Sequence, residues 1–117
     1  SSVALIEHYA GHEPYWPPTT PWWMHISAWW LQWDTYGPEL GAMDQAQGLA
    51  QYVQRTQTVQ AQAYAIAAQR CKQRFPACGG FIIWMGHDCY PCPINNSVID
   101  FDRQPKPAYH ALREVFR

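Results

Sequence analysis

The longest regular pattern of apolar and polar positions covers residues 44–75. Apolar side chains recur there close to every 3.6 residues, no proline interrupts them, and Arg55 is the only charge between Asp44 and Arg70. The recurring positions are Leu49, Val53, Thr56, Val59, Ala63, Ile66, Cys71 and Phe75. The pattern predicts one long helix within residues 41–75. Because the other positions are mostly glutamine and alanine, we expect this helix to be packed on more than one side.

A different pattern follows directly. Pro76 ends the helical pattern, Gly79-Gly80 indicates a turn, and residues 81–85 are then apolar without interruption. An unbroken apolar run of this length is typical of a strand that is covered on both faces in a parallel sheet. We therefore expect a single buried strand at residues 80–85.

The rest of the chain is less regular. Residues 1–40 read as aromatic- and proline-rich loops with short helices, among them a helix that Ser2 caps and Gly11 ends. Residues 86–104 read as a loop, with a short extended turn at 98–101. Residues 106–116 read as a final amphipathic helix with Pro107 in its first turn.

These elements predict a predominantly α chain with a single buried strand. A lone strand cannot satisfy its own backbone hydrogen bonds, so its neighbours must come from another copy or from a missing part of the protein. The order helix, strand, loop, helix is that of the last unit of a (β/α)8 TIM barrel. The first residues also lack an initiator methionine. We expect the chain to be the C-terminal segment of a longer barrel.

Composition excludes several partners. The net charge is −1, which does not favour nucleic acid or an anionic membrane. The longest strongly apolar run, Phe81 to Gly86, is far too short to cross a bilayer, and no signal peptide opens the chain. No motif calls for a cofactor. Seven Trp and seven Tyr allow both a rich core and stacking on ligands.

Cys71, Cys78, Cys89 and Cys92 permit two disulfides with three connectivities. The alternative is zinc, which the Cys89-x-x-Cys92 pair with His87 nearby would suggest. A structural zinc site needs two close ligand pairs. Cys71 and Cys78 make a poor second pair, because six residues lie between them and they belong to a separate segment. Ordinary thiols or a disulfide are therefore favoured, and no metal site is predicted.

Three motifs in the second half carry a resemblance to a known family. They are Gln57-Thr-Val-Gln60-Ala61, then Gly79-Gly80-Phe-Ile-Ile-Trp84-Met-Gly-His-Asp88-Cys-Tyr90-Pro91, then Ser97-Val-Ile-Asp100-Phe with Pro105-Lys106-Pro107-Ala108-Tyr109. In order and spacing they resemble the end of the catalytic barrel of glycoside hydrolase family 2, especially its β-mannosidase and exo-glucosaminidase branch. The opening segment, with Glu13-Pro-Tyr-Trp16-Pro-Pro, resembles more weakly the part after strand seven.

The chain departs from the family pattern at two positions. His87 stands where the family usually has Asn, and Asn96 stands where Trp commonly precedes the Ser. Both positions fall in the loop that would face the substrate. They put the identity of the sugar in doubt more than the fold.

The resemblance implies a retaining glycosidase that uses two carboxyl groups, an acid/base after strand four and a nucleophile after strand seven. Both would lie upstream of Ser1, so this chain would hold no catalytic residue. Glu7 is the alternative candidate, because Val-Ala-Leu-Ile-Glu imitates a strand that ends in a carboxylate. The better match places Glu7 on the short helix after the nucleophile.

The resemblance also implies substrate-binding residues. Trp84 would lie at the active-site end of the strand and stack on a sugar ring, with a core tryptophan as the alternative. Asp88 would accept hydrogen bonds from sugar hydroxyls or brace the loop, and His87 would flank it. Asp100 is expected to brace the loop through backbone N–H groups, and Lys106 to be a surface charge. The tryptophans at 22, 23, 29, 30 and 33 read first as packing.

The leading expectation is therefore part of a glycosidase for β-linked sugars, inactive alone and prone to self-association through its missing neighbours. One alternative is a stand-alone carbohydrate-binding module, which its many tryptophans support but its lack of short alternating strands opposes. A helical interaction domain stabilised by disulfides or metal is another. The family's usual role suggests a periplasmic or extracellular location.

Overall fold

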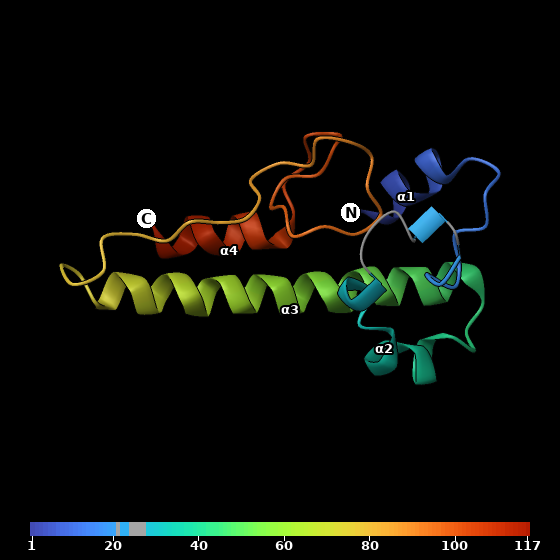
Figure 1. Ribbon diagram of the computed structural model, residues 1–117, viewed down its shortest axis with the longest axis horizontal. Coiled ribbons are helices and arrows are strands. Elements are labelled where there is room, and N and C mark those ends of the chain that lie inside the picture. Colours follow the sequence, from blue (N-terminus) through green and yellow to red (C-terminus); the bar gives the residue numbers. More distant parts are fainter. Residues whose placement is uncertain (21, 24–27) are drawn as a thin grey trace.

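The computed structural model describes residues 1–20, 22–23 and 28–117 and is mainly helical. The helices are α1 (Val3–Ala10), the 3-10 helix η2 (Ala28–Leu31), α2 (Trp33–Leu40), α3 (Gln45–Gln73) and α4 (Pro107–Val115). The molecule measures 50 × 28 × 22 Å. At a rise of about 1.5 Å per residue, α3 spans most of the long axis and is the element on which the others pack (Figure 1).

The expected long helix is present as α3. Its first turn is capped by Asp44, whose Oδ1 accepts a hydrogen bond from the Gln47 N–H at 3.0 Å. In its second half α3 is packed by α4 and by the extended segment that follows it, but one face stays uncovered. Val59 and Ile66 on that half are 50% and 60% exposed.

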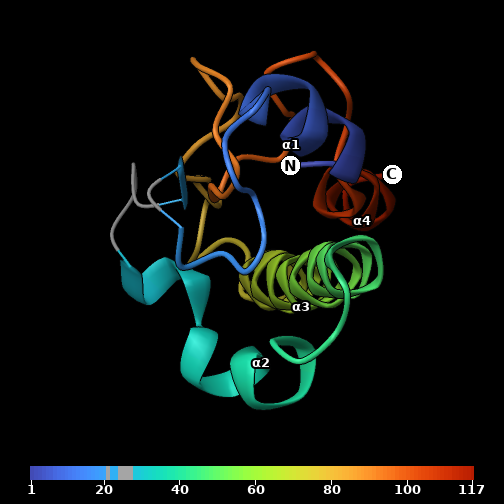
Figure 2. The ribbon, with the colours of Figure 1, turned by 90° about the vertical axis from the view of Figure 1, so that its right-hand side faces the viewer.

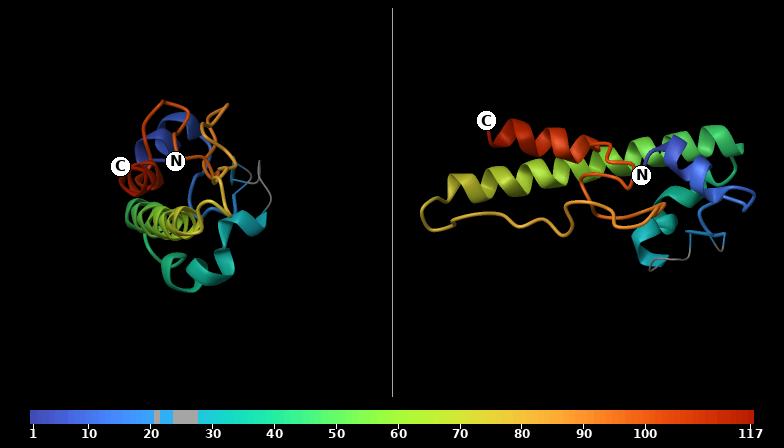
Figure 3. Two further views of the ribbon diagram at one scale, coloured as in Figure 1. Left: turned by 90° about the vertical axis from the view of Figure 1, so that its left-hand side faces the viewer. Right: turned by 90° about the horizontal axis from the view of Figure 1, so that it is seen from above.

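Two groups of elements cover α3. Figures 1 and 3 show α4 beside the C-terminal half of α3, running in the same direction. Figure 2 shows α1 and α2 on opposite sides of its N-terminal half. Among the tertiary contacts, the α3–α4 pair is the most extensive. The final helix expected at 106–116 is therefore the main partner of the long one.

The first core lies around the N-terminal half of α3 and is largely aromatic. Its fully buried members are Ile6, Trp23, Leu31, Leu40, Leu49 and Tyr52. Tyr52 is its centre, with edge-to-face contacts to four aromatic rings and its hydroxyl donating to the Leu31 carbonyl at 2.7 Å. This core fixes the aromatic segment before α2 against the long helix.

The tryptophans of residues 22–33 are mostly packing residues, as expected. Trp23 is fully buried, while Trp22 and Trp33 pack against the core from its edge. The Trp23 indole donates from Nε1 to the Tyr15 carbonyl at 2.6 Å. The Trp29 side chain, with residues 21 and 24–27, lies outside the described part.

Gly48 on α3 allows Trp16 to approach the helix closely. A Cβ at Gly48 would lie 2.5 Å from Cε2 and Cζ2 of the Trp16 indole, a distance that only a shift of the ring could relieve. Gly48→Ala should therefore destabilise the chain by about 1 kcal/mol, because the overpacking cost exceeds the gain in helix propensity. Thermal unfolding followed by circular dichroism measures this. Gly79→Ala, which meets nothing within 4 Å, is the control, and an equal effect in both variants would contradict the packing argument.

The second core lies between α3 and α4. Its buried members are Ala68, Val98, Ala108 and Leu112. Phe81 and Ile83 pack against the same cluster from the extended segment that follows α3. This core holds the C-terminal helix and the segment before the 86–104 loop on one half of the long helix.

The buried strand expected at residues 80–85 is not formed in the described chain. These residues are extended without a β-ladder, and Ile82 and Trp84 are 94% and 79% exposed. The physical reason is that the described residues supply no neighbouring strand to pair with. Burial alternates along the segment, with Phe81, Ile83 and Met85 partly buried between the exposed side chains. One face of an extended segment is thus covered by α3 and the other is bare.

The start of the chain folds as expected. The Ser2 side chain accepts a hydrogen bond from the Leu5 N–H at 3.1 Å and caps α1, and Gly11 ends the helix with φ 58°. Glu7 lies exposed on this helix rather than at the end of a strand. The alternative in which a strand presents Glu7 as a nucleophile is therefore wrong for this structure.

Candidate functional site

The loop that was expected to face the substrate is folded back on itself. The Gly86 carbonyl accepts hydrogen bonds from the Val98 and Ile99 N–H groups at 3.3 and 3.0 Å, and the Asp88 N–H donates to the Ile99 carbonyl at 3.1 Å. The Lys106 N–H then donates to the Val98 carbonyl at 2.9 Å. Both ends of the loop are thus attached to residues 98–99, and Ile99 makes isolated β-bridges to His87 and Pro105.

Lys106 is buried under this loop and is not the surface charge that its sequence position suggested. Its side chain is 3% exposed, and its Nζ lies 3.1 Å from Asp88 Oδ2 and 2.6 Å from Ser97 Oγ. Asp88 and Ser97 are fully buried. Lys106 immediately precedes α4, so the ion pair attaches the start of the loop to the start of the last helix.

The three expected substrate-binding residues lie in different surroundings. Trp84 is exposed just before the loop, and His87 is exposed within it. Asp88 is 0% exposed and holds Lys106, which fits the bracing role rather than direct contact with sugar hydroxyls. Its other oxygen, Oδ1, is buried and has no hydrogen-bond partner among the described residues. The structure therefore presents Trp84 and His87 at the surface and buries Asp88.

Asp100 braces the far end of the loop, as expected. It is 2% exposed, and its Oδ1 accepts a hydrogen bond from the Gln104 N–H at 2.8 Å. Its own N–H donates to the Gln104 carbonyl at 3.0 Å. This closed turn positions Pro105 and Lys106 for the return of the chain to α4.

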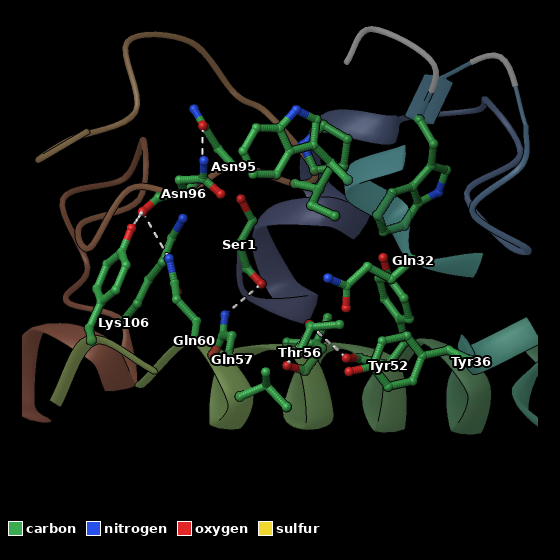
Figure 4. Close-up of a pocket in the computed structure, with 17 residues that line it drawn as sticks. Ser1, Gln32, Tyr36, Tyr52, Thr56, Gln57, Gln60, Asn95, Asn96 and Lys106 are labelled. Atoms are coloured by element: carbon green, nitrogen blue, oxygen red, sulfur yellow. Dashed lines mark hydrogen bonds between the residues drawn. The ribbon is translucent and has the colours of Figure 1, made fainter. Parts of the chain in front are cut away.

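A cavity of about 220 Å³ lies between the first core and the loop (Figure 4). One wall is the face of α3 that carries Tyr52, Thr56, Gln57, Gln60 and Tyr64. The residues around 93–96 form the opposite wall, and Trp30, Gln32 and Tyr36 form a third side. None of Trp84, His87 and Asp88 lines it.

The helix wall of the cavity is attached to the loop by hydrogen bonds. Gln60 Nε2 donates to the Asn96 and Ser97 carbonyls at 2.8 and 3.2 Å, and the Tyr64 hydroxyl donates to the Asn96 carbonyl at 2.9 Å. Gln57 Nε2 donates to the Ser1 carbonyl at 2.9 Å. Burial raises the pKa of the Tyr52 and Tyr64 hydroxyls, so both remain donors at neutral pH.

Sequence reasoning missed this wall of the cavity. It identified Gln57 and Gln60 as part of a family motif but gave them no contact. The signal that could have found them is the spacing Gln57, Gln60, Tyr64, which places three hydrogen-bonding side chains on one helix face. The apolar periodicity of residues 44–75 by itself gives these glutamines no role beyond the helix surface.

All four cysteines are free thiols in the structure. Cys92 is buried, and burial raises the pKa of its thiol. A hydrogen bond with Cys78 raises the pKa of the Cys71 thiol; Cys71 lies in the last turn of α3, and Cys78 follows the turn after that helix. Among the described residues, no group of three or more His, Cys, Asp or Glu side chains could hold a metal ion. No helix in the described part of the chain is long and apolar enough to cross a membrane.

Comparison with known proteins gives a consistent set of relatives. The chain is 33% identical over 73 residues to beta-mannosidase B of Aspergillus niger. The matched residues make up 60% of this chain and 8% of that protein. It is 32% identical over 75 residues to beta-mannosidase B of Aspergillus flavus and 31% over 75 residues to that of Emericella nidulans. The similarity indicates a relationship to glycoside hydrolases.

The matches cover only a small part of each relative. The chain spans less than a tenth of the length of these curated relatives. No family model matches it, and no solved structure matches it.

Proposed function

We propose that this chain is part of a retaining glycoside hydrolase that acts on β-linked sugars, from the β-mannosidase-like branch of family 2. In this proposal it forms the C-terminal segment of the (β/α)8 catalytic barrel and contributes sugar-binding residues. The two catalytic carboxyl groups, which retaining enzymes hold about 5–5.5 Å apart, belong to the part of the enzyme upstream. The observation that carries the proposal is the similarity to the fungal beta-mannosidases.

The alternating exposure of residues 81–85 supports the barrel. A barrel strand turns every second side chain toward the surrounding helices and the others toward the interior. Here Phe81 and Ile83 pack on the α3 side, while Ile82 and Trp84 are bare. In a complete barrel the bare face would point inward, and Trp84, near the C-terminal end of the strand, would point toward the active site.

A stand-alone carbohydrate-binding module fits the structure less well. Such modules are typically β-sandwiches, whereas the described residues contain helices and two isolated β-bridges. The proposal therefore assigns the sugar-binding role of Trp84 to a larger enzyme and gives Asp88 the task of positioning the loop beside it.

Trp84 gives the test of the proposed function. In the complete enzyme that contains this chain, Trp84→Ala should lower kcat/KM on 4-nitrophenyl β-D-mannopyranoside about 10- to 100-fold, because the sugar loses the aromatic face on which it stacks. Trp84→Phe keeps an aromatic face and should recover most of the activity. If the alanine and phenylalanine variants were both as active as the unchanged enzyme, Trp84 would not be part of the sugar site.

Self-association of the isolated chain is the second expected consequence. Ile82, Trp84, Val59 and Ile66 leave apolar surface uncovered that the rest of a barrel would cover. Sedimentation velocity of the 117-residue chain should show an average mass that rises with concentration. The double variant Ile82→Ser/Trp84→Ser should shift the chain toward monomer. A monodisperse monomer at all concentrations would contradict the claim that this apolar surface is normally covered by the rest of a barrel.

A further inference from the structure

We propose that the cavity between α3 and residues 93–96 binds one neutral sugar residue, separately from the Trp84 surface. This binding site does not depend on the proposed catalytic function, since all its walls belong to this chain. It also shares no residue with the expected substrate-binding set of Trp84, His87 and Asp88.

The size of the cavity favours a single ring. Its volume is about 220 Å³, which is below the roughly 300–1,000 Å³ that is usual for pockets of drug-sized ligands. It is open to solvent and bounded by rigid structure on two sides, the α3 helix and the hydrogen-bonded loop (Figure 4). An oligosaccharide would not fit inside it, but a monosaccharide unit would.

The chemistry of the walls favours a neutral polyhydroxylated ligand. The partly buried rings of Trp30 and Tyr36 line the cavity together with the amide groups of Gln32 and Asn96 and the hydroxyl of Thr56. Aromatic faces pack against the C–H faces of a sugar, and amides offer both donors and acceptors to its hydroxyls. A binding site for a purely apolar ligand would not need these amides.

The charge at the cavity excludes a strong preference for anions. Among the described residues of the lining, Lys106 carries the only charged side chain, and its ammonium is already paired with Asp88 and hydrogen-bonded to Ser97. A sugar acid would therefore find no free cation.

Unused hydrogen-bonding groups remain on two opposite sides of the cavity. Gln60 and Tyr64 already use their donors on the Asn96 carbonyl. In the described part of the chain, the side-chain amides of Asn96 and Gln32 make no hydrogen bond. Figure 4 shows Asn95 and Asn96 on one side of the cavity and Gln32 on the other. A sugar between them could receive and donate hydrogen bonds without breaking any that holds the fold.

The test measures binding of methyl β-D-mannopyranoside to the 117-residue chain by saturation-transfer NMR. Asn96→Leu should raise Kd at least about 5-fold, the factor expected when one ligand hydrogen bond is lost and its partner stays unsatisfied. Gln32→Leu, which removes the unpaired amide on the other side of the cavity, should also weaken binding and serves if Asn96→Leu disturbs the loop. Gln62→Leu, an exposed glutamine of the same helix outside the cavity, is the matched control.

Two further comparisons separate this inference from the proposed function. Trp84→Ala should leave binding at the cavity unchanged, whereas loss of binding in that variant alone would assign the sugar to the Trp84 surface and overturn the inference. Sodium glucuronate should bind no more tightly than the neutral glycoside. Tighter binding of the glucuronate, or no binding of either sugar, would also overturn it.

Discussion

Lys106→Met should lower the free energy of unfolding by about 3–5 kcal/mol, the usual cost of removing one partner from a buried ion pair. Lys106 and Asp88 are 3% and 0% exposed, so the remaining carboxylate could not recover its hydration. Ser97 Oγ, which accepts from Lys106 at 2.6 Å, would lose a partner as well. Because the pair attaches the loop to the start of α4, we expect the loop to become disordered when its contact with α4 is lost.

Two variants make this prediction specific. Asp88→Leu/Lys106→Met removes both charges and should be clearly more stable than Lys106→Met alone, since no charge is then left buried. Lys72→Met is the matched control. The Lys72 Nζ also contacts α4, where it donates to the Val115 carbonyl at 2.7 Å, but this contact is exposed to solvent. This variant should change stability by less than about 1 kcal/mol. Urea unfolding followed at 222 nm measures all three. An equal loss in the Lys106 and Lys72 variants would show that the ion pair is not buried in solution.

Tyr52→Ala should be comparably destabilising, by about 3–5 kcal/mol. Tyr52 is 2% exposed, and its ring lies within 6.1 Å of the rings of Trp16, Trp23 and Trp33, measured between centroids. Its removal would leave a cavity at the centre of the aromatic core. It would also leave the Leu31 carbonyl without the hydroxyl that donates to it.

A conservative substitution separates the two contributions of Tyr52. Tyr52→Phe keeps the ring and loses only the hydrogen bond, so it should cost about 1 kcal/mol. Near-UV circular dichroism should lose most of its intensity in Tyr52→Ala but not in Tyr52→Phe, because the tryptophans lose their fixed packing only when the ring is removed. Thermal unfolding of both variants gives the stabilities. Equal costs for the two would mean that the ring is not the centre of the core.

Helices α1, α3 and α4 were predictable from sequence because their signals are local. The 3.6-residue period over 44–75, the Ser2 cap and the proline at the start of α4 each act within one or two turns. The expected bracing role of Asp100 was also local, since its partner Gln104 is four residues away. The family resemblance, in turn, led to the same class of enzymes as the fungal relatives.

Features that depend on distant residues could not be predicted in the same way. The burial of Lys106 requires Asp88 and Ser97 to converge from 18 and 9 residues away, and no local pattern indicates this. The cavity combines residues from both ends of the chain with the middle of α3. The apolar run at 81–85 predicted a buried strand, but burial on the second face depends on neighbours that the chain does not supply.

The central claim is most directly tested on the product of the complete native gene, by measuring its intact mass together with its hydrolysis of 4-nitrophenyl β-D-mannopyranoside. The account predicts a product much larger than 13.5 kDa that hydrolyses the substrate with retention of configuration. A native product of this size alone, or a larger one that cleaves no aryl β-glycoside, would contradict it.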